Sequence, residues 1–136
     1  MSALPVTALY AGLLGLWLLA LAYEVVRRRW RYDVSLGSGG EPELERAIRA
    51  HGNAAETIPI GLILLGLAEG MGTPGWILHV AGLSLLTGRV LHGVHFVTYP
   101  KPMRLRFWGM VLTVGTIAAL SVGLVGHSAL RLMVGA

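Results

Sequence analysis

The segment RAHGNAAETIP, residues 49–59, runs without a break into the apolar stretch IGLILLGLA, residues 60–68. Four polar side chains therefore stand at the start of a segment suited to hydrocarbon: Arg49, His51, Asn53 and Glu56. Ionisable side chains in a membrane helix cost free energy, so they usually face other polar groups or a functional cavity. The segment predicts a membrane helix with a polar site at one of its ends.

The composition of the whole chain also favours a membrane environment. Of the 136 residues, 54% are hydrophobic and 13% are charged, and the mean hydropathy is +0.66. Soluble domains carry about 25% charged residues, and a water-soluble core of this size would not bury so much apolar surface. The chain contains no cysteine, which excludes disulfides, thiolate metal sites and a cysteine nucleophile.

Apolar segments predict an all-α integral membrane protein, a four-transmembrane-helix bundle in which residues 1–136 form a single domain. We expect helices over residues 4–26, 42–70, 75–97 and 106–130. A membrane-spanning helix needs about 20 mostly apolar residues. The apolar part of the second segment is shorter, but Pro42 and the acidic residues after it are typical of a helix start. A helix over 42–70 would be about 43 Å long and would span the bilayer.

The basic residues predict the orientation in the membrane. Nine of the eleven follow the first segment or separate the third from the fourth: Arg27, Arg28, Arg29, Arg31, Arg46, Arg49, Lys101, Arg104 and Arg106. The positive-inside rule places these regions in the cytoplasm and both termini outside it. Because RRRWR, residues 27–31, follows the first apolar segment, that segment is expected to be a retained helix. The basic surplus then indicates topology and contact with membrane lipids, with no nucleic-acid partner. The compact chain favours a bacterial inner membrane, with an endoplasmic-reticulum membrane as the alternative.

Polar side chains on the second and third segments are spaced to share a face. Arg49, Asn53 and Glu56 are spaced i, i+4, i+7 and fall within about 60° of one another on a helix. Arg89 and His92 are similarly close on the third segment. Because the two faces lie at similar depth, they should meet. They would form either a structural ion pair between Glu56 and Arg89 or a polar pocket.

The balance of charge favours the pocket. One glutamate does not neutralise the basic groups around it, so we expect excess positive charge that attracts a small anionic ligand from the cytoplasmic side. His92 and His95, spaced i, i+3 and without cysteine, are a weak zinc signal, and no metal site is expected.

The stretches ERAIRAHGNAAETIP, residues 45–59, and GRVLHGVHF, residues 88–96, resemble the MAPEG family, the membrane-associated proteins in eicosanoid and glutathione metabolism. Among its well-known members, the pattern is most similar to microsomal prostaglandin E synthase. The resemblance covers nearly the whole chain. It implies a homotrimer of four-helix bundles with a glutathione site between subunits, near the cytoplasmic interface.

The resemblance also implies which residues hold glutathione. By position, Arg49, Asn53 and Glu56 would bind the tripeptide, with His51 alongside. Arg89 and His92 match pocket positions on the third helix. The resemblance also implies an arginine at the end of the first helix. The register there is ambiguous, so one or more of three consecutive residues could supply it, with Arg28 at the centre: Arg27, Arg28 and Arg29.

The chemistry implied by the family requires a glutathione thiolate, and a nearby cation lowers the pKa of a thiol. The family places an arginine for this purpose at the start of the fourth helix, where PMRLRFWGM, residues 102–110, offers Arg104 and Arg106 as catalytic residues. Counting from His92 and alignment through Pro102 favour Arg104, which we prefer, whereas alignment through the following aromatic and glycine residues favours Arg106. Two departures stand out: Phe96 replaces a tyrosine of several relatives, and Gly52 replaces a basic residue.

The function implied is a glutathione-dependent membrane enzyme that conjugates or reduces a lipophilic electrophile or hydroperoxide. The first alternative is a non-enzymatic membrane protein of the same fold that binds an anionic metabolite or a protein partner. A second alternative is a small transporter, although no discontinuous helix pair is evident in the sequence.

Overall fold

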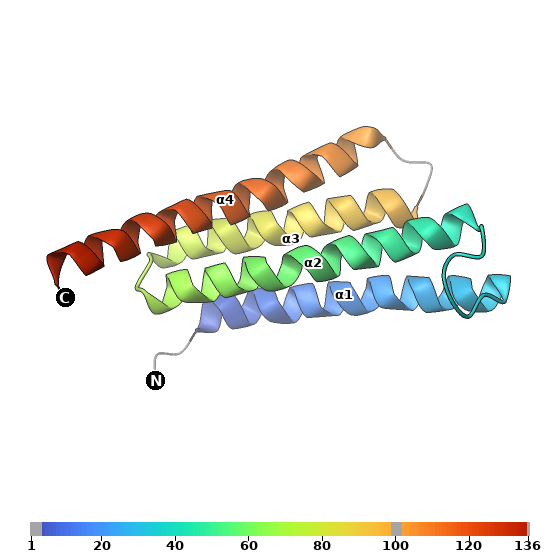
Figure 1. Cartoon of the computed structure of the whole chain (residues 1–136), viewed down its shortest axis with the longest axis horizontal. Helices are drawn as coiled ribbons and strands as arrows, with labels where there is room; N and C mark the ends of the chain where they lie inside the picture. Colours follow the sequence, from blue (N-terminus) through green and yellow to red (C-terminus); the bar gives the residue numbers. More distant parts are fainter. Residues whose placement is uncertain (1–3, 99–101, 136) are drawn as a thin grey trace.

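A computed structural model describes residues 4–98 and 102–135 of the chain and contains four helices arranged as an antiparallel bundle (Figure 1). Their bounds are α1 Pro5–Tyr32, α2 Pro42–Gly70, α3 Gly75–Val97 and α4 Met103–Val134. The all-α bundle is therefore confirmed. The first helix is longer than expected because the arginine-rich segment that ends the apolar stretch continues the helix to Tyr32, and α4 begins at Met103, directly after Pro102.

The two middle helices of the chain form the centre of the bundle. α2 and α3 each pack on all three other helices, whereas α1 and α4 do not touch within the described residues. Leucine, isoleucine and alanine side chains fill the space between α1, α2 and α3: Leu14, Leu21, Ala50, Ala54, Ile58 and Leu85. The start of α1 and the end of α4 lie at one end of the bundle, and the α1–α2 connection, the end of α3 and the start of α4 lie at the other (Figure 1). Lys101, between α3 and α4 in the sequence, lies outside the described residues.

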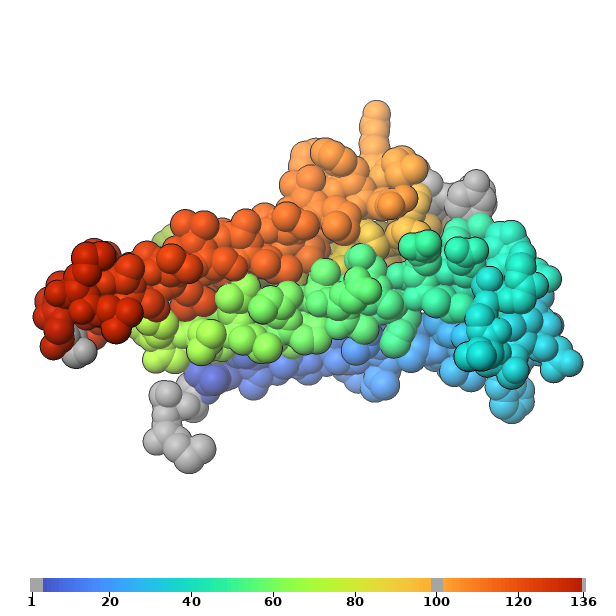
Figure 2. Space-filling view, viewed as in Figure 1, coloured from blue at the N-terminus to red at the C-terminus, as the bar shows by residue number. Residues whose placement is uncertain are grey.

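The outer surface of the bundle is suited to lipid. Three of the helices are long and apolar enough to cross a membrane: α1, α3 and α4. Outward-facing side chains are large and apolar, with Leu16 and Leu19 each 67% exposed and Val122 73% exposed. Figure 2 shows the C-terminal end of α4 extending past the other helices. α2, whose first half is charged, packs against both α1 and α3. α2 continues through Pro59, and no helix is interrupted in the described ranges.

A side chain from α2 caps the start of α1. Leu4, at the N-cap position, has no side-chain acceptor for the free N–H groups of the first turn. Glu69, in the last turn of α2, accepts them instead, from the backbone nitrogen of Val6 at 3.0 Å and of Thr7 at 2.7 Å. This tertiary cap joins the beginning of α1 to the end of α2.

Glycines allow α3 and α4 to meet backbone to backbone. A Cβ on Gly88 would lie 2.9 Å from the carbonyl oxygen of Gly109, and a Cβ on Gly109 would lie 2.7 Å from the backbone nitrogen of His92. Next to this contact, the Thr116 hydroxyl of α4 donates to the Ser84 hydroxyl of α3 at 2.9 Å. The close approach brings the first turns of α4 against the last turns of α3.

Candidate functional site

A pocket of about 510 Å³ lies at the end of the bundle that carries the α1–α2 connection. Its walls come from the α1–α2 connection, the first half of α2, the last turns of α3 and the first turn of α4. The lining residues are Gly37, Ser38, Glu45, Ile48, Arg49, Gly52, Asn53, Glu56, His92, Phe96 and Arg106. Segments that are far apart in the sequence therefore meet around one cavity.

One face of α2 forms the longest wall. Its lining residues recur every three or four positions, from Glu45 to Glu56, as expected for one face of a helix. Arg49, Asn53 and Glu56, which the spacing places on a common face, all line the pocket. Ser38 and Gly37 close the wall at the connection from α1. The Gly37 carbonyl accepts a hydrogen bond from the Arg29 guanidinium at 3.0 Å, so Arg29 holds this part of the connection in place.

An aromatic ring organises the wall contributed by α3 and α4. The ring of Phe96 lies 5.0 Å from the ring of His92, and the Arg106 guanidinium lies over the Phe96 ring at 5.3 Å from its centre. A cation over an aromatic face is attracted by the negative face of the ring. Phe96 therefore supports the cation at the mouth of the pocket. Of the two arginines at the start of α4, Arg106 lines the pocket and Arg104 does not.

Arg89 lies behind the pocket. It is 1% exposed, and its Nη1 donates to Asn53 Oδ1 at 2.8 Å and to Thr57 Oγ1 at 2.5 Å. No ion pair joins Arg89 to Glu56 in the described part of the chain, so the structural ion pair considered as an alternative is wrong here. The reason is helix geometry, because Asn53 and Thr57 are one turn apart and face α3, while Glu56 is turned toward the cavity.

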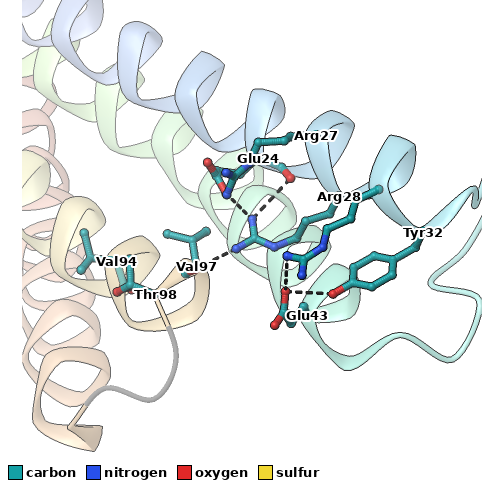
Figure 3. Close-up of polar contacts among 9 residues, drawn as sticks. Glu24, Arg27, Arg28, Tyr32, Glu43, Val94, Val97 and Thr98 are labelled. Atoms are coloured by element: carbon teal, nitrogen blue, oxygen red, sulfur yellow. Dashed lines mark hydrogen bonds and ion pairs between the residues drawn. The ribbon is translucent and has the colours of Figure 1, made fainter.

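Arg28 also lies away from the pocket, at the contact between α1 and α3 (Figure 3). Its side chain is buried and forms an ion pair with Glu24, while its Nη2 donates to the carbonyl oxygen of Val97 at 2.8 Å. Arg27 forms an exposed ion pair with the same carboxylate at 2.9 Å. Arg28 therefore fastens the end of α1 to the last turn of α3, which carries the aromatic wall of the pocket.

The charges of the lining are balanced, which corrects the expectation of a net positive pocket. The lining carries two carboxylates, Glu45 and Glu56, and two guanidinium groups, Arg49 and Arg106. The Glu45 carboxylate lies 3.9 Å from Arg49 Nε. His51 is half-buried and outside the lining. No group of three or more potential metal-ligating side chains comes together within residues 4–98 and 102–135. The arrangement suits an elongated ligand that carries both signs of charge.

Comparison with known proteins identifies the family of this chain. The model of the MAPEG family matches residues 7–126. The chain belongs to the MAPEG family. It is also similar to the inner membrane protein YecN of Escherichia coli strain K12 and to that of E. coli O6:H1 strain CFT073. Each is 44% identical over 108 residues, which cover 79% of this chain and 81% of the relative.

Within this MAPEG fold, some lining residues are not among the candidates from the sequence. Glu45 and Ile48 extend the α2 stripe by one turn, and the same three-to-four-residue spacing that relates Arg49 to Asn53 predicts them. Gly37 and Ser38 come from an irregular connection, where periodicity carries no information. Thr57, which accepts from Arg89 behind the pocket, was also not a candidate, because only the neighbouring Glu56 was considered from the sequence as a partner of Arg89.

Proposed function

We propose that this MAPEG protein is a glutathione-dependent membrane enzyme that conjugates a lipophilic electrophile or reduces a lipid hydroperoxide. One observation carries the proposal: five of the residues that the family resemblance implicates line a single pocket, namely Arg49, Asn53, Glu56, His92 and Arg106. The pocket volume of about 510 Å³ lies within the range of roughly 300–1,000 Å³ that is typical of small-molecule sites.

The charges of the pocket support a tripeptide of mixed charge. Glutathione has one ammonium group and two carboxylates. The lining offers carboxylates to the ammonium group and guanidinium groups to the carboxylates. Glu45 and Glu56 are eleven positions apart, so this wall of the pocket extends about 16 Å along the axis of α2. In our proposal Glu56 binds the ammonium group, and Arg49 with Asn53 binds a carboxylate.

In our proposal, Arg106 acts on the thiol. A cation next to the sulfur favours the ionised form, so the thiol proton passes to water and a thiolate remains. In conjugation, the thiolate forms a carbon–sulfur bond as the leaving group departs with its electron pair. In hydroperoxide reduction, the thiolate attacks the terminal peroxide oxygen, the oxygen–oxygen bond breaks, and the lipid alkoxide leaves and takes a proton from water to become the alcohol. A second glutathione then converts the resulting sulfenic acid to the disulfide and water.

We also propose that the protein is a homotrimer in a bacterial inner membrane, with both termini outside the cytoplasm. The inner-membrane names of the two similar proteins support this location, and the basic residues at the pocket end support the orientation. Four candidates lie outside the lining of one protomer. Arg89 lies behind the pocket wall of its own protomer, and the other three would act from a neighbouring subunit or not at all: Arg28, His51 and Arg104.

Ultraviolet difference spectroscopy tests the proposed thiolate. We expect a saturable thiolate absorption when the purified protein is titrated with glutathione. Arg106→Met should remove this absorption, whereas Arg104→Met, a matched control two residues away, should retain it. A protein that binds glutathione by calorimetry but gives no thiolate absorption would refute the catalytic proposal.

The second candidate function is a non-enzymatic ligand-binding protein. Two pocket residues favour this function. Phe96 stands where several members of the family have tyrosine, and Gly52 stands where a basic residue is found, so neither brings a hydrogen-bonding side chain to the ligand. This function predicts saturable binding together with no turnover above the uncatalysed rate across a panel of electrophiles and hydroperoxides. Turnover that depends on Arg106 would exclude it.

A further inference from the structure

Arg89 is held by polar atoms of one neighbouring helix. Its hydrogen bonds within the described residues all leave from Nη1, to Asn53 Oδ1 at 2.8 Å, the Asn53 carbonyl oxygen at 3.2 Å and Thr57 Oγ1 at 2.5 Å. Nε and Nη2 are buried and have no hydrogen-bond partner in the same ranges. The side chain therefore contributes a charged donor to α2 from behind the pocket wall.

A guanidinium only donates, so it fixes the orientation of its partners. The Thr57 hydroxyl donates its proton to the Asn53 carbonyl oxygen at 2.7 Å, which leaves a lone pair to accept from Arg89. For the same reason the Asn53 amide turns Oδ1 toward Arg89. The oxygen and nitrogen of an amide are assigned from their hydrogen-bond partners, and next to this guanidinium only one orientation forms a hydrogen bond.

The other end of the amide is directed away from Arg89. Nδ2 carries two N–H donors, and it has no hydrogen-bond partner among the described residues. Nδ2 is not one of the fully buried side-chain atoms that lack a partner, so it is accessible from outside the protein. Asn53 lines the pocket, while Arg89 does not. Asn53 therefore combines a place in the pocket lining with an amide nitrogen that is free to donate.

We propose that Arg89 is a positioning residue: it holds the Asn53 amide with Nδ2 facing the pocket, and so selects a ligand with a carboxylate or carbonyl oxygen at that point. Arg49, one turn along the same face of α2, provides a cation beside it. The identity of the ligand as glutathione rests on the proposed function. The orientation of the amide does not.

The sequence makes this orientation directly measurable. Asn53 is the only asparagine, and the chain contains no glutamine, so protein labelled with nitrogen-15 has a single side-chain amide NH₂ group. In detergent-solubilised protein we expect one sharp pair of NH₂ signals whose protons exchange with water. Glutathione should shift this pair and slow its exchange, because the bound ligand accepts a hydrogen bond from it.

Three substitutions separate positioning from packing. Asn53→Asp keeps an acceptor for Arg89 but places oxygen where the pocket had a donor. We expect glutathione affinity to fall roughly 10- to 100-fold while the unfolding temperature is maintained. Arg89→Met removes the donor that fixes the amide, and should broaden the NH₂ pair and weaken binding about 10-fold. Arg89→Lys, which also only donates, should restore a sharp pair and most of the affinity.

The outcomes separate the positioning role of Arg89 from the proposed glutathione-dependent function. Asn53→Asp that binds glutathione as tightly as the wild type refutes the positioning role, as does a wild-type NH₂ pair that is protected from water before ligand is added. If the wild type binds no glutathione, the proposed function fails. The exchange of the NH₂ protons in the wild type and Arg89→Lys then still decides the orientation. If Arg89→Met does not fold, Asn53→Asp and Arg89→Lys decide the question.

Discussion

The backbone contact between α3 and α4 predicts that one added methyl group will disturb both the fold and the site. A Cβ on Gly109 would lie 2.7 Å from the His92 nitrogen and 2.8 Å from the Gly88 carbonyl oxygen. Both neighbours are backbone atoms, so no side-chain rotation relieves the overlap. For an ordinary contact of 3.4 Å the two helices must separate by about 0.7 Å. Overpacking of this kind costs about 1–3 kcal/mol.

Gly115→Ala is the matched control, because a Cβ on Gly115 meets nothing within 4 Å. Replacing glycine by alanine stabilises a helix interior by about 1 kcal/mol, and this gain is common to both variants. Gly109→Ala should therefore be about 1–3 kcal/mol less stable than Gly115→Ala. At roughly 4 °C per kcal/mol for a chain of this size, the unfolding temperatures should differ by about 4–12 °C.

The assay is thermal unfolding in a fixed detergent, followed by circular dichroism. Because the shift of α4 moves Arg106 relative to His92, Gly109→Ala should also give less glutathione thiolate than the control. Gly126→Ala, another position with nothing within 4 Å, guards against an unsuspected contact at Gly115. Equal unfolding temperatures for Gly109→Ala and both controls would show that the helices do not meet in this way.

Three further predictions concern contacts at the two ends of the bundle. Glu69→Ala removes the cap of α1 and should lower the free energy of unfolding by about 1 kcal/mol, with Glu69→Gln intermediate, as measured by thermal unfolding. Arg28→Met leaves the Glu24 carboxylate with only the exposed Arg27 as an ion-pair partner, removes the donor to the Val97 carbonyl, and should cost on the order of 3 kcal/mol. The exposed Arg27→Met should cost less than about 1 kcal/mol in the same assay, and equal losses would contradict the assigned burial. Tyr10→Phe removes a hydrogen bond to the His79 carbonyl at 3.1 Å and should cost about 1 kcal/mol, whereas no loss would indicate that water replaces it.

The sequence predicted the helices well because their signals are local. Apolar length, proline at helix starts and acidic residues in the first turn of α2 are read within one segment. The same periodicity placed Arg49, Asn53 and Glu56 on the face that lines the pocket. The end of α1 was less predictable, because its arginine-rich last turns do not continue the apolar pattern although they continue the helix to Tyr32.

The partners of buried charges were not predictable from spacing alone. Glu56 and Arg89 have matching depth, yet the rotation of α2 about its axis turns Asn53 and Thr57 toward Arg89. Likewise, the sequence does not distinguish Arg28 from its neighbours, although contact with Glu24 and Val97 sets it apart in the structure. Helix rotation depends on packing at many contacts, including Gly88 against Gly109, and a single sequence contains no direct measure of it.

The distribution of the pocket walls along the chain has a consequence for biogenesis. The walls run from Gly37 to Arg106, so the cavity is complete only after the last helix has packed on α3. During synthesis, the first three helices emerge and insert before α4 is available. A ligand that binds only the complete cavity would stabilise the finished bundle by mass action. Ligand supply would then influence how much newly made protein matures and how much is degraded.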